Sequence, residues 1–268
     1  MTRSDYEQRV REIHELIRAG DAYQVNLTRR LTGPHLDPIA LWDAVASGNP
    51  APHRAFWRDG RGLAVVSASP ERFLRIDGDR VETRPIKGTA TRANRLRTSE
   101  KDHAENVMIV DLARNDLGRV CVPGTIRVPE LCRVETHPGL VHLVSTVRGR
   151  LAPGIGIGQV LRATFPPASI TGAPKPRVMQ AIEDLEPVRR GLYCGTMGWI
   201  DADRRRADLA VTIRTFTCTP DATTFGVGAG ITIDSDPAAE WAETELKSAR
   251  LLMLAGERSE PLLMSAQP

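Results

Sequence analysis

The sequence predicts an α+β fold in which helices and mainly antiparallel strands occupy separate stretches of the chain. Strand-like segments follow one another without helices between them, most clearly over residues 195–233, where polar turns separate three expected strands. Helices that do not alternate one by one with strands are typical of antiparallel sheets with helices packed on them. The 268 residues hold no internal repeat and no long polar linker. We therefore expect one domain over residues 1–256, followed by a flexible tail over residues 257–268.

The expected helices begin with residues 4–19, where Ser4 and Glu7 have the spacing of a capping box and apolar residues recur every three or four positions. The other expected helices cover residues 38–47, 99–114, 157–164, 177–185 and 237–254. The expected strands cover residues 21–31, 56–66, 72–76, 80–84, 120–128, 131–134, 141–151, 195–200, 208–217 and 223–233. A tight turn at Asp77-Gly78 would join two of them into a hairpin.

Composition excludes several classes of function. The net charge is +3, the basic residues are scattered and aromatic residues make up 4% of the chain, so we expect no nucleic-acid partner. The cysteines are far apart and form no Cys-x-x-Cys pair, which argues against a zinc site or a disulfide scaffold. They fit reduced thiols in a cytoplasmic protein. No apolar run is long enough to cross a bilayer, so we expect no membrane association.

Lys87 stands out among the basic residues. Only four of the 36 Lys and Arg residues are Lys, so arginine is the usual cation of this chain. Pro85 suits a strand end and Gly88 permits a turn, which would hold Lys87 at a strand-to-loop junction. A desolvated lysine has a lowered pKa and can act as a nucleophile. The alternative, a surface cation, is the commoner situation for a single lysine.

Carboxylates gather on two of the expected helices. Glu240, Glu243 and Lys247 follow i, i+3, i+7 spacing and share one helix face, and Asp102 and Glu105 are spaced i, i+3. Oxygen ligands without paired His or Cys favour Mg²⁺. The alternative is that these are solvated helix charges.

Three further features have both a structural and a functional interpretation. The glycine run at 226–230 precedes a strand-like segment rather than a helix, so it is no dinucleotide fingerprint and indicates close backbone approach instead. Arg214 lies among apolar residues and, if buried, requires an anionic partner such as a substrate carboxylate. His142, also in an apolar segment, fits a structural residue as well as a catalytic one.

Several motifs occur in order along the chain: residues 20–27 (GDAYQVNL), 69–73 (SPERF), 84–89 (RPIKGT), 100–106 (EKDHAEN) with 111–116 (DLARND), 169–175 (SITGAPK) and the acidic last helix. With them the chain resembles the chorismate-utilising enzymes, the family of the anthranilate synthase and aminodeoxychorismate synthase large subunits. The resemblance runs from about Ser4 to Leu254. It implies a chorismate-binding catalytic domain of two packed, mainly antiparallel sheets flanked by helices, with chorismate and Mg²⁺ in a cleft between the sheets.

The resemblance also implies roles for individual residues. Mg²⁺ would be held by Glu105 and Glu243 with Asp102 and Glu240 beside them. Tyr193 and Arg214 match positions that take the pyruvyl carboxylate, and Gly228, Gly230 and Lys247 match positions at the ring carboxylate. The remaining positions expected to bind substrate are Gly88, Thr89, Gln24, Ser169 and Thr171.

For catalysis, the resemblance assigns Glu71 as the general acid for the leaving 4-hydroxyl and Lys87 as the nucleophile that adds at C2 before ammonia attacks C4. His142 is expected beside the ring. Isochorismate and salicylate synthases carry a water-activating lysine where Gln24 stands, so ammonia, supplied by a glutaminase partner, is the expected nucleophile. The implied product is 4-amino-4-deoxychorismate, for para-aminobenzoate and folate synthesis. The alternatives are an anthranilate synthase and a catalytically silent chorismate-binding subunit.

Overall fold

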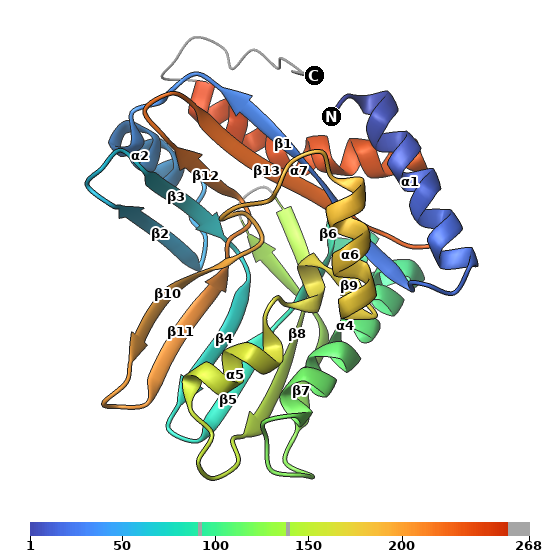
Figure 1. Cartoon of the computed structure of the whole chain (residues 1–268), viewed down its shortest axis with the longest axis vertical. Helices are drawn as coiled ribbons and strands as arrows, with labels where there is room; N and C mark the ends of the chain where they lie inside the picture. Colours follow the sequence, from blue (N-terminus) through green and yellow to red (C-terminus); the bar gives the residue numbers. More distant parts are fainter. Residues whose placement is uncertain (91–92, 138–139, 257–268) are drawn as a thin grey trace. The chain divides into compact units, whose positions relative to one another are not determined.

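The structure is a computed structural model that describes residues 1–90, 93–137 and 140–256, so the expected tail lies outside the described residues. The chain forms two compact units (Figure 1). Among the described residues, the first comprises Met1–Pro70, Ile170–Gly195 and Thr212–Gly256, and the second comprises Glu71–Ser169 and Thr196–Val211. The single catalytic domain expected from the sequence stays a prediction.

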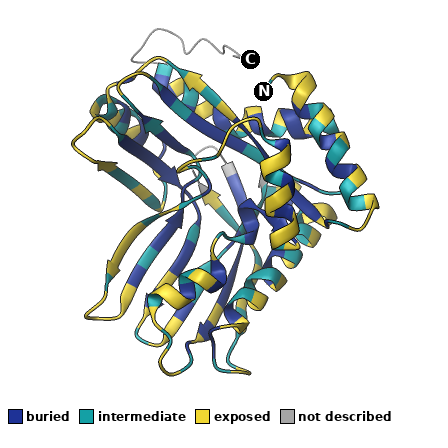
Figure 2. Cartoon of the chain, viewed as in Figure 1, coloured by how far each residue is buried: buried dark blue, intermediate teal, exposed yellow. Residues whose placement is uncertain are grey.

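The first unit is built on an antiparallel sheet with strand order β2-β3-β12-β13-β1-β9. Its strands are β1 (Gln24–Gly33), β2 (His53–Arg58), β3 (Ala64–Ser69), β9 (Gly172–Ala173), β12 (Thr215–Cys218) and β13 (Thr223–Ile231). Its helices are α1 (Arg3–Arg18), α2 (Pro38–Gly48), α6 (Lys175–Leu185) and α7 (Pro237–Gly256). The central pair, β1 and β13, runs in register from Val25 opposite Ile231 to Gly33 opposite Thr223 and is largely buried (Figure 2).

Helix α1 shows how local sequence and packing combine. Its N-cap is Thr2, whose side chain accepts from Asp5 N while Asp5 reaches back to Thr2 N, so the capping box expected at Ser4 and Glu7 is wrong by two residues. The predicted apolar face is buried, and Tyr6 meets Trp241 of α7 edge-on with ring centroids 5.6 Å apart. Such aromatic pairs add about 0.5–1.5 kcal/mol beyond area burial.

The second unit contains an antiparallel sheet with strand order β10-β11-β4-β5-β8-β6, and β7 also pairs with β8. Its strands are β4 (Arg72–Asp77), β5 (Arg80–Arg84), β6 (Ile86–Ala90), β7 (Arg127–His137), β8 (Leu140–Arg150), β10 (Thr196–Asp201) and β11 (Arg206–Val211). Its helices are α3 (Ala93–Thr98), α4 (Glu100–Gly118) and α5 (Ile157–Thr164). The short helix η1 (Ala168–Ile170) ends this unit and begins the return to the first.

The α+β fold with two mainly antiparallel sheets is therefore confirmed, and several element predictions are corrected. The expected strand at 56–66 is the hairpin β2–β3, closed by a turn in which Asp59 Oδ1 accepts from the backbone N–H groups of Arg61 and Leu63. The expected strand at 208–217 is two strands, β11 and β12, in different sheets, because Arg214 has φ +52° and interrupts extended pairing. Helix α3 was not expected, and α6 begins at Lys175 rather than at 177.

Among the helices in the described part of the chain, none has the length and apolar character needed to cross a membrane.

Candidate active site

Lys87 lies on β6 at an irregularity in its pairing with β8. Lys87 is opposite Leu143 and Thr89 is opposite His142, so the register shifts across Gly88. Gly88 has φ +79°, a backbone conformation that favours glycine. β-bulges of this kind re-aim a side chain and are frequent beside active sites. The predicted strand-to-loop junction at Lys87 is thus a bulge within a strand, and the lysine is half-buried there.

The bulge lies directly against the first turns of α4. A Cβ placed on Gly88 would come within 3.1 Å of Asp102 Cβ, so a side chain at position 88 would press on the helix. Ser99 caps α4 by accepting from Asp102 N at 3.2 Å. Glu105, one turn further along, has a side chain 14% exposed and lies 3.9 Å from Lys101. Two predicted metal ligands and the predicted nucleophile therefore belong to neighbouring elements of the second unit.

A buried polar network fixes this arrangement, and sequence reasoning missed it. Asn106, 1% exposed, donates from Nδ2 to the carbonyl of Leu143, the residue opposite Lys87. Ser145 Oγ donates to Asn106 Oδ1 and accepts from Cys132 N. A fully satisfied buried network stabilises one arrangement of the elements that it joins. The sequence held one signal for it: Asn106 precedes Ile109 by three residues and Val110 by four, and therefore lies on the same buried face of α4.

Glu71 and Ser169 meet in the interior of the second unit. Glu71 is 3% exposed, and its carbonyl accepts from Val211 N at 3.1 Å, which anchors the backbone just before β4. Ser169 Oγ, on η1, donates to Glu71 Oε1 at 2.6 Å. Both residues line a cavity of about 20 Å³. A carboxyl group buried in this way is suited to general acid catalysis, because burial disfavours its charged form.

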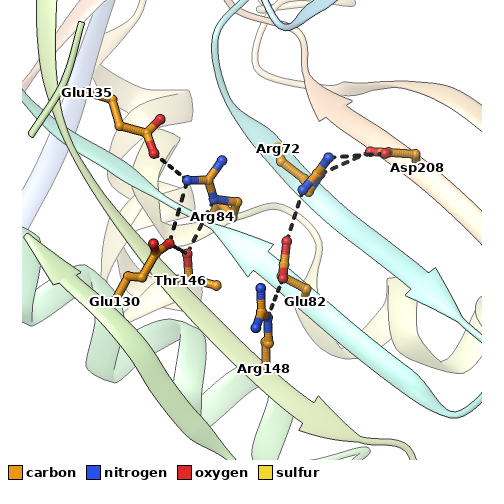
Figure 3. Close-up of polar contacts among 8 residues, drawn as sticks. All are labelled: Arg72, Glu82, Arg84, Glu130, Glu135, Thr146, Arg148 and Asp208. Carbon is orange, nitrogen blue, oxygen red and sulfur yellow. Dashed lines mark hydrogen bonds and ion pairs between the residues drawn. The ribbon is translucent and has the colours of Figure 1, made fainter. Parts of the chain in front are cut away.

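Salt bridges tie together the strands that carry these residues (Figure 3). Arg72, next to Glu71, contacts Glu82 at 2.9 Å and Asp208 at 3.2 Å. Arg84, at the end of β5 and close to Lys87 in sequence, contacts Glu130 and Glu135 of β7. The other contacts in the view are Arg84 with Thr146, Thr146 with Glu130, and Arg148 with Glu82. The paired charges are partly buried and cross-link β4, β5, β7, β8 and β11, which limits how far these strands can shift.

In the first unit, the predicted carboxylate-binding residues of α7 and β13 come together. Lys247 Nζ donates to the carbonyl of Gly228 at 3.1 Å and lies 2.6 Å from Glu243 Oε1. A Cβ on Gly228 would approach the Leu27 carbonyl oxygen to 2.5 Å, so this position requires glycine. Lys247 is thus an ammonium held beside half-buried strand backbone, and an anionic ligand could take the place of its acidic neighbour Glu243.

Tyr193 and Arg214 lie in unusual surroundings of the same unit. The Tyr193 ring covers Gly226, since a Cβ there would lie 2.3 Å from the ring. Burial raises the pKa of the Tyr193 hydroxyl well above its ordinary value. Arg214 combines φ +52° with desolvation that lowers its pKa to about 10. Strained backbone is frequent at ligand sites, and a desolvated guanidinium gains strongly from an anionic ligand.

Gln24 has a buried amide without a protein partner. It is 1% exposed, and neither Nε2 nor Oε1 has a hydrogen-bond partner among the described residues. The segment from Thr171 to Ala173 pairs with β1 in antiparallel orientation at this point. Asn26 N donates to Thr171 O at 2.7 Å, and Gln24 is opposite Ala173. Buried polar groups are almost always satisfied in native proteins, so this amide marks a place for a ligand or water.

A buried ion pair, which the sequence analysis did not identify, ties the start of this segment to β1. Arg190 forms a bidentate pair with Glu186, whose side chain is 4% exposed, through bonds of 2.9 and 2.7 Å. The same guanidinium donates to the carbonyls of Ile170 and Asn26 at 2.7 and 2.6 Å. Arg190 thereby ties the backbone just before Thr171 to Asn26 of β1.

The predicted metal ligands fit Mg²⁺ by donor chemistry, since all are carboxylates. Asp102 and Glu105 belong to the second unit, and Glu240 and Glu243 to the first. Glu240 is 3% exposed and accepts from Ser235 Oγ at 2.6 Å. In residues 1–90, 93–137 and 140–256, no three His, Cys, Asp or Glu side chains gather in a metal-binding arrangement. The ligand set therefore stays a prediction.

Residues 1–253 match the family model of chorismate binding enzymes. The chain belongs to this family. It is 43% identical over 263 residues to aminodeoxychorismate synthase component 1 of Salmonella typhimurium, a match that covers 94% of this chain and 58% of that protein. It is also 43% identical over 271 residues to anthranilate synthase component 1 of Streptomyces coelicolor, covering 97% and 53%.

The chain also superimposes on the crystal structure of anthranilate synthase component I from Streptococcus pneumoniae, with a TM-score of 0.86 and 32% sequence identity. The match covers 94% of this chain and 58% of that one. The chain thus spans little more than half the length of the relatives that it matches. The family expected from the sequence motifs is confirmed.

Proposed function

We propose that this protein is an aminodeoxychorismate synthase component, which converts chorismate and ammonia to 4-amino-4-deoxychorismate. The observation that carries the proposal is Lys87, an amine half-buried at a β-bulge beside the carboxylate-bearing helix α4. An amine in that setting is suited to nucleophilic catalysis. The relative from Salmonella typhimurium carries the same activity in its name.

In the proposed reaction, Lys87 Nζ adds to C2 of the chorismate ring while the C4–O bond breaks. Glu71 gives its proton to the departing 4-hydroxyl, which leaves as water. Ammonia then attacks C4, the C2–N bond to Lys87 breaks, and the proton lost from the new amine returns to Glu71. Ser169 contacts Glu71. His142, 1% exposed on β8, is paired with Thr89 of β6, the strand that carries Lys87. Two displacements split one difficult substitution into two easier steps.

We assign the substrate's negative charges to residues whose surroundings favour anions. Arg214 and Tyr193 take the pyruvyl carboxylate, which offsets the desolvation of the guanidinium. Lys247, with the backbone of Gly228 and Gly230, takes the ring carboxylate. The backbone around Gly88 and Thr89 and the side chain of Thr171 complete the proposed contacts.

We assign Mg²⁺ to Glu105 and Glu243, with Asp102 and Glu240 supporting them. Held by these carboxylates, Mg²⁺ would supply positive charge against the ring carboxylate of chorismate. Glu243 now pairs with Lys247, so binding of the ion would compete with that ion pair. Glu240 is held by Ser235 and serves more naturally through a bound water than as a direct ligand.

Gln24 favours ammonia over water as the second nucleophile. An amide has no basic nitrogen and cannot activate water as a general base, whereas ammonia needs no activation. We propose that a glutaminase partner supplies this ammonia, since relatives named component 1 imply a second component. The product would serve para-aminobenzoate and folate synthesis in the cytoplasm.

Anthranilate synthesis is the second candidate, because the relative from Streptomyces coelicolor, equally similar at 43% identity, is named for it. In that reaction ammonia attacks C2 directly, so a lysine positioned to occupy C2 would be an obstacle. A catalytically silent subunit is the third candidate.

The test is a product assay with the purified chain, chorismate, Mg²⁺ and ammonium at mildly alkaline pH, read by mass spectrometry. We expect aminodeoxychorismate from the wild type and a loss of at least about 10³-fold in Lys87→Ala, in the range of removing a covalent nucleophile. Lys87→Arg is the matched control, because it keeps the positive charge without a nucleophilic amine. Anthranilate as the main product, or full activity of Lys87→Arg, would refute the proposal. Untouched chorismate, even with a glutaminase added, would favour a silent subunit.

A further inference from the structure

The hydrogen bond between Ser169 and Glu71 has a consequence for proton transfer. A protonated carboxyl group has one oxygen that donates and one that accepts, and a general acid works only if the donating oxygen faces the leaving group. Ser169 Oγ donates to Oε1 of Glu71 at 2.6 Å. That bond keeps Oε1 as the acceptor, so the proton of the neutral acid resides on Oε2.

We propose that Ser169 is a positioning residue that selects the oxygen of Glu71 which carries the catalytic proton. This inference rests on the proposed function, in which Glu71 protonates the 4-hydroxyl, and assigns Ser169 a role toward Glu71 rather than toward the ring. The step itself is unchanged: the Oε2–H bond breaks, the proton joins the departing hydroxyl, and the C4–O bond cleaves to release water.

The carboxyl group of Glu71 lies where solvent does not replace the Ser169 donor. The carboxyl group is 3% exposed and Ser169 is 7% exposed, so bulk solvent does not compete for Oε1. The cavity beside them, about 20 Å³, has room for one water molecule. Its lining is otherwise mainly apolar, with Phe73, Leu74 and Ile109 among its walls.

Two charged side chains, Asp116 and Arg72, lie near Glu71 in space or in the chain. Among the described residues that line the cavity, Asp116 of α4 is the other ionisable side chain. Arg72 follows Glu71 in the chain, but its guanidinium is held by Glu82 and Asp208. Asp116 would disfavour the ionised form of Glu71, whereas the Ser169 donor favours it, so the two effects on the titration of Glu71 have opposite signs.

The first measurement does not depend on turnover. Glutamate carboxyl carbons are labelled with ¹³C, the Glu71 signal is assigned as the one that Glu71→Gln removes, and its chemical shift is followed with pH. We expect Ser169→Ala to raise the titration midpoint by about one pH unit, since a hydrogen bond to a charged group is lost. Ser169→Thr keeps the hydroxyl and should leave the midpoint within about 0.3 units of wild type. Asp116→Asn should lower it.

The second measurement is a double-mutant cycle on amination. We expect Ser169→Ala to lower kcat about 10- to 100-fold with KM within about two-fold of wild type, and to move the alkaline limb of the kcat profile to higher pH. Ser169→Thr should restore most of the rate. In a Glu71→Gln background, Ser169→Ala should cost nothing further, because there is no acidic proton left to place.

The matched control is Thr223→Val, which removes a hydroxyl that is 3% exposed and accepts from Leu36 N at 2.9 Å. It should lower stability without moving the Glu71 midpoint or the alkaline limb. An unchanged midpoint in Ser169→Ala overturns the inference, whatever the activity. A loss confined to KM and additive with Glu71→Gln overturns it as well, and would place Ser169 on the substrate. A shifted midpoint in a protein that leaves chorismate untouched would instead refute the proposed function and keep the Ser169–Glu71 coupling.

Discussion

Replacing Gln24 by Met should make the protein more stable and less active. The Gln24 side chain is 1% exposed, and both of its amide atoms lack a partner among the described residues. A buried polar group left unsatisfied costs about 1–3 kcal/mol, and Met is close to Gln in size and shape without the amide. We expect the free energy of unfolding to rise by about 1–3 kcal/mol, which corresponds to roughly 2–12 °C in Tm for a chain of this size.

Urea denaturation and thermal scans measure the stability, and the chorismate assay measures the activity. The control is Gln180→Met, because Gln180 is exposed on α6 and donates to the nearby Asp184, so the free energy of unfolding should change by less than about 0.5 kcal/mol. Amination should fall at least about ten-fold in Gln24→Met, since the amide would no longer contact substrate or ammonia. A Gln24→Met protein that is destabilised by more than about 1 kcal/mol and fully active would refute the reasoning, because the amide would then be satisfied and serve the fold alone.

Three other outcomes are expected. Gly226→Ala drives a methyl group into the tyrosine ring 2.3 Å away and should raise KM for chorismate several-fold; an unchanged KM would separate that ring from substrate binding. Glu186→Gln leaves the Arg190 guanidinium without its buried counter-charge and should cost about 3–5 kcal/mol in calorimetry, whereas a loss below about 1 kcal/mol would mean that backbone carbonyls suffice. The pKa of Glu130 lies below its ordinary value because Thr146 and Arg133 bond to its charged form. A carboxyl group with a depressed pKa stabilises the fold above its ordinary pKa of 4.5, and this stability is lost as the pH falls through the folded-state pKa. Glu130→Gln should therefore flatten the decline of Tm as the pH falls below about 5. An unchanged slope of Tm against pH would contradict this.

Helices were predicted well because their signal is local. The recurrence of Tyr6, Val10 and Ile13 every three or four residues identified α1, and the same residues are buried in the structure. The strands were harder, since a run of extended residues does not reveal where the chain leaves one sheet for another. The segment 208–217 looked continuous, yet a single left-handed residue, Arg214, divides it between two sheets. In a sequence, glycine is the residue that commonly indicates a left-handed backbone conformation, and arginine gives no such indication.

In the candidate site, too, local sequence signals were visible and long-range contacts were not. Short motifs pointed to Lys87 and Glu71, whose roles stay predictions, and they placed Lys247 and Gly228 together, which the structure shows in contact. The contacts that hold those groups in place were not visible. Ser169 and Glu71 are 98 residues apart, and Arg190 meets Asn26 across 164 residues. No spacing rule reaches such distances, because they depend on how strands from remote segments pair.

The glycines of β13 illustrate what a sequence can establish without the fold. Their spacing suits a phosphate loop, but the strand-like residues after them argued for close backbone approach instead, and that interpretation is confirmed. Gly226 lies under the Tyr193 ring, and Gly228 lies against the Leu27 carbonyl while its own carbonyl accepts from Lys247. The Tyr193 ring thus requires glycine at position 226, and the paired strand β1 requires glycine at position 228. A strand without side chains at these positions leaves its backbone accessible to close neighbours, and the Lys247 ammonium reaches the Gly228 carbonyl there. The proposed contact of β13 with substrate would likewise be made by its backbone groups rather than by a side chain that a motif search could find.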